Sequence, residues 1–397
     1  MDINTKLIHG YPVFDQQTGA SSIPLYQAST FQQGAIDQPQ DFTYSRFGNP
    51  TRQALEEAIA AIEGGRCGFA FASGMAAISS VLLLFEAGDH LVFCKSIYGG
   101  TFTLAETVLK RFGIKVSYVD ETDPTAWEQA ICPETKALYM ETPSNPLLKI
   151  TDIRKVAALA KKRGLLSIID NTFMTPQFQS PLSLGVDIVI HSATKFLNGH
   201  SDVVAGLVVT NNLTLADQIR QQQTVLGSIL GVEDCWLVLR GMKTMGLRMA
   251  QSATSAQKIA EFLEQAPQVT AVHYPGLPAH PGAEIHAKQA TSGGAVLSFE
   301  LENREAVLSF AAAVKLPITA VSLGGVESIL SYPATMSHAC VPAEERAKQG
   351  ITEGLLRLSV GIEDTEDLLV DLQQALAQIP NASSKKADNL LHTASGT

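Results

Sequence analysis

Short apolar runs rich in Val, Ile and Leu alternate with amphipathic stretches between about residues 67 and 210. The runs predict strands buried on both faces, and the stretches between them predict helices. The expected strands are 68–72, 90–94, 115–119, 136–141, 165–169, 186–190 and 205–209. The expected helices are 75–86, 101–112, 124–131, 152–163 and 177–184. This order predicts a doubly wound α/β domain with a mostly parallel sheet.

The regions on either side have other patterns. Residues 1–60 lack a clear period and predict an extended arm, with a helix beginning near Thr51 and ending before Gly64. A long helical region, 232–265, leads to a second unit of mixed α and β pattern. Its expected strands are 269–274, 295–301 and 355–360, and its expected helices are 304–314 and 364–377.

These patterns predict four parts. They are an arm (1–60), a large α/β domain (61–250), a small C-terminal α+β domain (251–380) and a tail expected to be disordered (381–397). An arm without a core of its own often packs on a neighbouring subunit, so the arm is expected to make such a contact.

Composition narrows the classes of partner. The chain has 397 residues, is 45% hydrophobic and carries a formal net charge of −10. This charge argues against nucleic acid, because phosphate binding needs a clustered basic surface. No apolar run reaches the roughly 18 residues of a membrane span, and the N-terminus has no apolar signal region, so we expect a cytoplasmic location and no membrane partner. The five cysteines form no CxxC pair, which fits reduced thiols, and no metal site is expected.

Two of the predicted strands deliver an acid and an amine to the same edge of the sheet. Asp170 ends the run 165–169, and Lys195 follows the run 187–190. Ligands bind outside the carboxyl ends of strands in open α/β sheets. A lysine there can form a Schiff base with pyridoxal 5′-phosphate (PLP), and an aspartate can pair with its pyridinium nitrogen. Taken alone, the lysine could instead reach out to water, and the aspartate could be a cap or turn residue.

Small and polar residues nearby could hold a phosphate. Ser192 and Thr194 place two hydroxyls within one turn of the lysine. Ser73, Gly74 and Met75 form a turn into a predicted helix, whose free N–H groups favour an anion and where glycine permits close approach.

Aromatic and basic residues add to this picture. Tyr98 follows another predicted strand and could stack on a flat cofactor. Tyr44 and Arg46 lie in the arm, where Arg46 could clamp a phosphate across a subunit interface or simply lie in a surface turn.

Arg357 interrupts an otherwise apolar strand, so its charge needs an anion. That anion could be the carboxylate of an amino acid, or an internal partner such as Glu327 or Glu353. The loop that begins at Ser322 contains two glycines and could border the same pocket.

With these residues in view, the chain closely resembles the PLP-dependent enzymes of cysteine and methionine metabolism from about residue 7 to residue 376. The matching motifs are Tyr44-Ser-Arg46, Ala72-Ser-Gly-Met75, Tyr98-Gly-Gly, Glu141-Thr-Pro-Ser-Asn145-Pro, Asp170-Asn-Thr, His191-Ser-Ala-Thr-Lys195, Ser322-Leu-Gly and Leu356-Arg-Leu-Ser-Val-Gly. Each motif alone is weak, but all of them in this order are not expected by chance.

The resemblance implies the PLP-dependent transferase fold of type I and a role for each matching position. Lys195 would be the Schiff-base lysine and proton shuttle, and Asp170 the partner of the ring nitrogen. Residues implied to bind the phosphate are Ser73, Gly74, Met75, Ser192 and Thr194, with Tyr44 and Arg46 reaching it from a neighbouring subunit. Tyr98 would stack on the ring and assist acid–base chemistry. Residues implied to border the substrate are Asn145, Val321, Ser322, Leu323 and Arg357. The resemblance also implies a homotetramer made of two catalytic dimers.

Two positions bear on the substrate. Gly100 stands where bacterial methionine γ-lyases carry a cysteine, and Val321 stands where many γ-specific members carry a glutamate. The resemblance therefore implies a carbon–sulfur lyase acting on cystathionine, with β-elimination favoured. A cystathionine γ-lyase that also releases hydrogen sulfide from cysteine or homocysteine is the main alternative. Methionine γ-lyase, cystathionine γ-synthase, a transaminase and a non-catalytic binding protein are less expected.

Overall fold

The computed structural model describes residues 1–38, 40–337, 339 and 343–379, so the predicted tail lies outside the described residues. Its larger body is built on a seven-stranded sheet of order β1-β7-β6-β5-β4-β2-β3. The strands are β1 (Cys67–Phe71), β2 (His90–Cys94), β3 (Lys115–Val119), β4 (Thr135–Glu141), β5 (Leu166–Asp170), β6 (Ile188–Ser192) and β7 (Gly206–Thr210). β7 pairs antiparallel with β1 and with β6, and the other four neighbouring pairs are parallel, so the predicted mostly parallel sheet is confirmed.

Helices cover both faces of this sheet, which is why every residue of β2 and β7 is buried. They are α2 (Pro50–Glu63), α3 (Gly74–Leu82), α4 (Gly99–Leu104), α5 (Pro124–Gln129), α6 (Ile153–Arg163), α7 (Thr175–Phe178) and α8 (Leu213–Leu226). Their ends follow local chemistry. The Asn49 side chain caps α2 before Pro50 at its first position, and Gly64 ends it at a φ of 73°.

The smaller body has its own sheet and its own core. Its five strands have the order β10-β11-β12-β9-β8 and, except for the pair β10–β11, are antiparallel. They are β8 (Val269–His273), β9 (Val296–Leu301), β10 (Ile318–Thr319), β11 (Ile329–Ser331) and β12 (Leu355–Ser359). The helices of this part are α11 (Ala283–Gln289), α12 (Arg304–Ala313), α13 (Ala343–Gln349) and α14 (Thr365–Leu376). Phe299 and Phe310 pack edge to face in the core, with ring centroids 5.5 Å apart.

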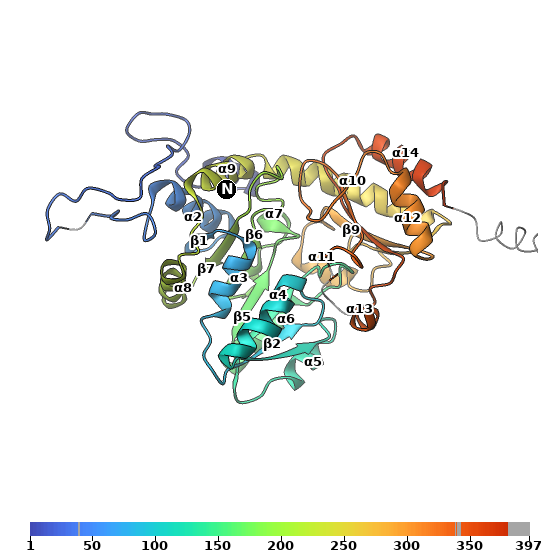
Figure 1. Cartoon of the computed structure of the whole chain (residues 1–397), viewed down its shortest axis with the longest axis horizontal. Helices are drawn as coiled ribbons and strands as arrows, with labels where there is room; N and C mark the ends of the chain where they lie inside the picture. The colour runs from blue at the N-terminus through green and yellow to red at the C-terminus, as the bar shows by residue number, and fades with distance from the viewer. Residues whose placement is uncertain (39, 338, 340–342, 380–397) are drawn as a thin grey trace, which may run out of the picture.

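Two helices connect the bodies where the sequence predicted one long helical region. They are α9 (Val232–Met242) and α10 (Met245–Gln265), and α10 runs from the larger body into the smaller one (Figure 1). The residue boundaries of the predicted domains remain predictions.

The sequence-based elements differ from the structure in a few places. The expected helix 177–184 is two short pieces, α7 and a 3-10 turn (Pro181–Leu184), because Gln179 leaves the helix to bridge Ala290. The expected helix 101–112 becomes α4, a π-helical turn (Ala105–Leu109) and a 3-10 turn (Lys110–Phe112). The helix α8 was not predicted.

The described residues before α2 contain one helix, α1 (Ile3–His9), which packs against α2 and α10. The chain that follows it projects from the side of the larger body as long loops (blue in Figure 1). Among the described residues, no helix is both long enough and apolar enough to cross a membrane.

Candidate active site

Three neighbouring strands, β4, β5 and β6, end in Glu141, Asp170 and Ser192, and these residues border a cavity of about 680 Å³. Residues from the smaller body close its other side, so the cavity lies between the two sheets. Thirteen of the predicted site residues line it: Ser73, Gly74, Met75, Tyr98, Asn145, Asp170, Ser192, Thr194, Lys195, Val321, Ser322, Leu323 and Arg357. The structure therefore brings these thirteen residues together at one cavity, from both bodies of the fold.

Lys195 lies just beyond the end of β6 with its amine directed across the cavity. Its Nζ donates a hydrogen bond to Ser322 Oγ at 2.5 Å, a contact between the two bodies. Burial, with a smaller contribution from the charge of Arg357, lowers the pKa of Lys195 to about 8. About a tenth of the amine is therefore unprotonated at pH 7, far more than at the ordinary pKa of a lysine, and this form is the one that acts as a nucleophile or base.

Asp170 ends β5 and is both a turn residue and a cavity residue. Its Oδ1 accepts hydrogen bonds from the backbone N of Thr172 at 3.0 Å and from Thr172 Oγ1 at 2.5 Å. Among the described residues no donor contacts Oδ2, so one oxygen is left for the cavity. Burial raises the pKa of Asp170, while the two Thr172 hydrogen bonds and the nearby His191 oppose that rise.

The N-terminus of α3 forms a cradle with the segment after β6. Ser73 caps the helix by accepting from Ala76 N at 3.0 Å, so the helix begins directly at the cavity. A Cβ added to Gly74 would lie 3.0 Å from Ser192 Cβ, so only glycine leaves this space open. The free N–H groups and dipole of the helix, together with the hydroxyls of Ser192 and Thr194, suit a phosphate.

Tyr98 precedes α4 at the cavity, and its position depends on the carboxyl of Glu141, for which no role was predicted. The backbone N of Tyr98 donates to both oxygens of Glu141, at 2.9 and 3.0 Å. Burial and then the charge of Asp170 raise the pKa of Glu141 well above its ordinary value. Thr172 was also missed, although its Oγ1 joins Asp170 to the backbone N of Ser192. Both residues belong to motifs that match the family, Glu141-Thr-Pro-Ser-Asn145-Pro and Asp170-Asn-Thr172, and these motifs could have indicated them.

Arg357 projects from β12 into the cavity and is only 2% exposed. Its Nη1 donates to Asn145 Oδ1 at 2.9 Å, and its Nη2 donates to Ser322 O at 2.6 Å and Ser331 Oγ at 3.1 Å. Its Nε has no hydrogen-bond partner among the described residues. Burial lowers the pKa of Arg357 to about 10, which still leaves it charged at neutral pH.

The two internal partners considered for this arginine are engaged elsewhere. Glu353 pairs with Arg346 at 3.6 Å and accepts from Tyr332 at 2.7 Å, while Glu327 accepts from Ser201 at 2.5 Å. The described residues therefore present a buried cation without a carboxylate, which favours an anionic ligand.

The loop 321–325 completes the wall. Ser322 has a φ of 86°, in the left-handed region that residues other than glycine rarely adopt, and it contacts Lys195. Leu323 is buried, whereas Val321 is 65% exposed at the cavity.

Tyr44 and Arg46 do not line this cavity. They lie in the arm, where Arg46 Nη1 donates to Thr224 O at 3.0 Å and its guanidinium lies over the rings of Tyr44 and Phe47. Within one chain the structure does not bring them to the other site residues.

The groups in the cavity match the chemical parts of PLP. The α3 cradle suits the phosphate ester, the Lys195 amine suits the aldehyde, and the free oxygen of Asp170 suits the ring nitrogen. The guanidinium of Arg357 at the cavity, which has no carboxylate partner among the described residues, suits the carboxylate of an amino acid.

Known proteins agree with this fit. The family model described as "Cys/Met metabolism PLP-dependent enzyme" matches residues 4–377. The cystathionine beta-lyase MetC of Bacillus subtilis (strain 168) is 56% identical over 381 residues, which are 96% of this chain and 98% of the relative. The cystathionine gamma-lyase of the same strain is 51% identical over 379 residues, 96% of this chain and 100% of the relative.

A solved structure is similar over the same extent. The cystathionine gamma-lyase from Lactobacillus plantarum complexed with L-serine has a TM-score of 0.93 and 49% identity, covering 96% of this chain and 99% of that one. This likeness confirms the predicted fold. The protein therefore belongs to the Cys/Met metabolism PLP-dependent enzyme family, and PLP is its cofactor.

Proposed function

We propose that the protein is a carbon–sulfur lyase that cleaves L-cystathionine by β-elimination. With one water consumed, the products are homocysteine, pyruvate and ammonia. The observation that carries this proposal is the cavity itself, where the buried Arg357, with no carboxylate partner in the described part of the chain, lies with an amine whose pKa is about 8. Such a site can bind an amino acid and take a proton from it.

Substrate binding begins with the carboxylate of the amino acid. Arg357 is held by Asn145, Ser322 O and Ser331, so its planar guanidinium is fixed before the substrate arrives. The fork of an arginine pairs with both oxygens of a carboxylate. This pairing orients the α-carbon of the substrate toward Lys195.

Proton transfer is assigned to Lys195. When bound, PLP supplies the electron sink that stabilises negative charge at the α-carbon. The Lys195 amine removes the α-proton and then donates a proton to the sulfur that leaves the β-carbon. General acid–base help of this kind is worth roughly 10²- to 10⁴-fold. Ser322, which accepts from Nζ at 2.5 Å, keeps the amine directed across the cavity while it is free.

The remaining roles concern the cofactor. The free oxygen of Asp170 would pair with the ring nitrogen, and the ring of Tyr98 would stack on the cofactor and assist acid–base chemistry. The phosphate would bind the N-terminus of α3 with Ser192 and Thr194. Tyr44 and Arg46 would complete this phosphate site from a second copy of the chain.

The preference for β-elimination rests on Val321. Many γ-specific members of the family carry a glutamate at this position, and its carboxylate can bind the distal amino group of cystathionine. The exposed Val321 at the cavity cannot. The relatives bear on both reactions, since they include beta-lyases and gamma-lyases at similar identity. The γ-lyase, giving cysteine, 2-oxobutyrate and ammonia, is therefore the second candidate.

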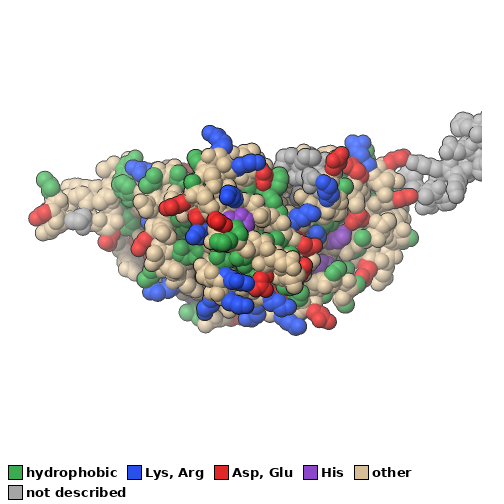
Figure 2. Space-filling view, turned by 90° about the horizontal axis from the view of Figure 1, so that it is seen from below, with side chains coloured by type: hydrophobic (Ala, Val, Ile, Leu, Met, Phe, Trp, Pro, Cys, Tyr) green, Lys and Arg blue, Asp and Glu red, His purple; other side chains and the backbone are tan. Residues whose placement is uncertain are grey.

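We also infer a homotetramer of two catalytic dimers in the cytoplasm. The arm supports the first part, because it carries exposed apolar side chains that a neighbouring copy would cover (Figure 2). They are Phe14, Leu25, Ile36, Tyr44 and Phe47. The free thiols of the described cysteines support a reducing compartment.

The test is to incubate purified protein and PLP with L-cystathionine and identify the products by mass spectrometry, with Lys195→Ala as the control. Homocysteine with pyruvate supports the proposal. Cysteine with 2-oxobutyrate would replace it with the γ-lyase, and absence of both pairs would exclude cystathionine as the substrate.

A further inference from the structure

Arg52, on the first turns of α2, is a buried cation whose side chain is 2% exposed. It is not at the cavity. Its Nη1 donates to Ser45 O at 2.7 Å and its Nη2 donates to Arg46 O at 3.4 Å. Both acceptors are backbone carbonyls of the segment Tyr44–Arg46. The hydrogen bonds of this buried guanidinium thus fix the backbone path of the arm.

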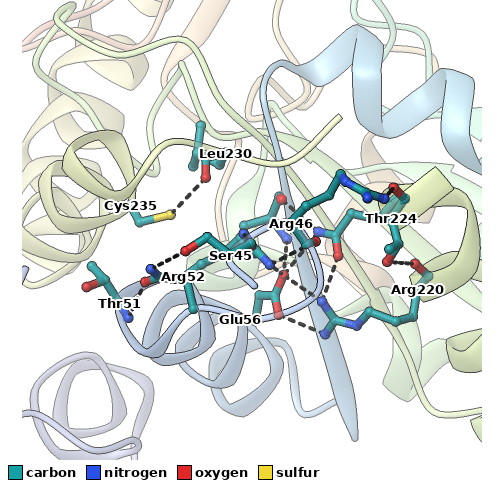
Figure 3. Close-up of polar contacts among 12 residues, drawn as sticks. Ser45, Arg46, Thr51, Arg52, Glu56, Arg220, Thr224, Leu230 and Cys235 are labelled. Carbon is teal, nitrogen blue, oxygen red and sulfur yellow. Dashed lines mark hydrogen bonds and ion pairs between the residues drawn. The ribbon is translucent and has the colours of Figure 1, made fainter. Parts of the chain in front are cut away.

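Arg52 is tied in turn to the sheet of the larger body. Its Nε lies 3.7 Å from Glu56 Oε1, and Glu56 lies between Arg52 and Arg220 (Figure 3). Glu56 Oε2 pairs with Arg220 Nη2 at 2.8 Å, and Glu56 Oε1 accepts from the backbone N of Ala70 in β1 at 3.0 Å. The arm segment is therefore anchored through Arg52 and Glu56 to a strand and to α8.

In the same segment the ring of Tyr44 is exposed, while Arg46 is part-buried and donates a hydrogen bond to Thr224 O. Tyr44 is 41% exposed, and Arg46 lies over its ring with a centroid distance of 5.6 Å. The carboxylate of Glu56 forms ion pairs with both Arg52 and Arg220. No carboxylate of a described residue forms an ion pair with Arg46. The cluster thus has an excess of positive charge, which suits an external anion.

We propose that Arg52 is a positioning residue that holds the backbone of Ser45 and Arg46 so that Tyr44 and Arg46 can bind the PLP phosphate of a second copy of the chain. The inference rests on the proposed role of the arm and adds the element that sets its geometry. Arg52 acts through Arg46 and does not touch the cofactor. A lysine at this position has one nitrogen and cannot reproduce the planar pair of bonds to two carbonyls.

The first experiment measures the affinity of the apoenzyme for PLP, from the visible absorbance of the bound cofactor, without substrate. Arg46→Gln should weaken it roughly 10- to 100-fold, the cost of a charged hydrogen bond, and Arg52→Lys should weaken it to a similar extent. The double variant should be little weaker than Arg46→Gln, because both substitutions remove the same contact. A multiplicative loss in the double variant would overturn the proposal.

Arg220→Lys is the matched control. Arg220 binds the same carboxylate but does not contact the segment Tyr44–Arg46. Its substitution should lower the melting temperature of the apoenzyme and leave PLP affinity within about twofold. An equal loss of PLP affinity in Arg220→Lys would mean that Arg52 is merely structural.

A hybrid experiment tests whether the effect passes between copies, and it works even where Arg52→Lys alone is weakly folded. Chains carrying Lys195→Ala are mixed with chains carrying Arg52→Lys. In the hybrid, one site combines an intact Lys195 with an intact arm from the other chain, so PLP affinity and turnover at that site should recover. No recovery, with hybrids verified by mass, would overturn the proposal.

The results separate the two levels of inference. If Arg46→Gln leaves PLP affinity unchanged, the arm does not reach the cofactor, and both the role of the arm and the role of Arg52 fail. If Arg46→Gln weakens PLP and Arg52→Lys does not, only the positioning role fails. The choice of cystathionine as substrate is untouched by either result.

Discussion

Replacing Glu141 by glutamine should leave the enzyme largely intact, because the structure indicates that this carboxyl is neutral. Glu141 and Asp170 are register partners at the ends of adjacent strands. At a strand spacing of about 4.8 Å, two carboxylates repel by about 3 kcal/mol at an effective dielectric constant near 20. One proton on the pair removes this cost.

The hydrogen bonds decide which carboxyl holds the proton. Asp170 accepts two bonds from Thr172 and is near His191, and these favour its charged form. Among the described residues, Glu141 accepts only the backbone N–H of Tyr98, and burial and the charge of Asp170 raise its pKa well above the ordinary value. We therefore expect a protonated Glu141 beside an ionised Asp170.

The assay compares matched amide substitutions on the two strands. Glu141→Gln should keep PLP affinity and kcat/KM within about fivefold, whereas Asp170→Asn should lose far more. Glu141→Ala leaves the Tyr98 amide without its acceptor, at a cost of about 1–3 kcal/mol, or roughly 5- to 150-fold. The infrared band of a protonated carboxyl should disappear in Glu141→Gln. A loss in Glu141→Gln as large as in Glu141→Ala would refute the reasoning, since it would show that the charge of Glu141 is needed.

Three further predictions concern other parts of the molecule. Arg357→Lys keeps the charge but loses the planar pair of N–H donors. In steady-state assays, kcat/KM for the amino-acid substrate should therefore fall roughly 10- to 100-fold, mainly through KM, with PLP affinity unchanged. An unchanged KM would contradict the carboxylate role. Because the pKa of Lys195 is about 8, the rate at which apoenzyme rebinds PLP, followed by stopped flow, should rise with pH and level off above about 8; a rate independent of pH from 7 to 9 would count against an unprotonated amine. Burial lowers the pKa of His280 from 6.5 to about 4, so between these values the folded chain binds fewer protons than the unfolded chain, and stability falls as the pH drops through this window. His280→Asn should reduce this dependence by up to about 1.4 kcal/mol per pH unit in urea unfolding, and an unaltered slope would exclude His280 as its source.

The parts of the site that follow from local sequence were predictable. Asp170 comes directly after one apolar run and Lys195 follows another after four intervening residues, and the end of a buried strand fixes where the next residues lie. Glu141 also ends a strand, but nothing local distinguishes a buried, neutral glutamate from one that faces water. Its state depends on Asp170, which belongs to a different strand.

The helix α8 shows why a pattern can fail. Its buried positions include Leu215, Ile219 and Gln223, at the spacing of one helical face. Gln223 is polar, so the apolar face of the helix stops at Ile219 in the sequence pattern. Gln223 is satisfied in the fold by Glu56 and by the backbone of Ala70, partners far away in the chain.

The long distance in sequence between the cofactor groups and Arg357 has a consequence for biosynthesis. The ribosome completes the segment from Ser73 to Lys195 well before β12 emerges. A nascent chain can thus present the groups that hold PLP at a stage when it has no arginine for the carboxylate of a substrate. A chain that ends before β12 therefore lacks the guanidinium that would orient an amino acid at the cavity, whatever cofactor groups it already carries.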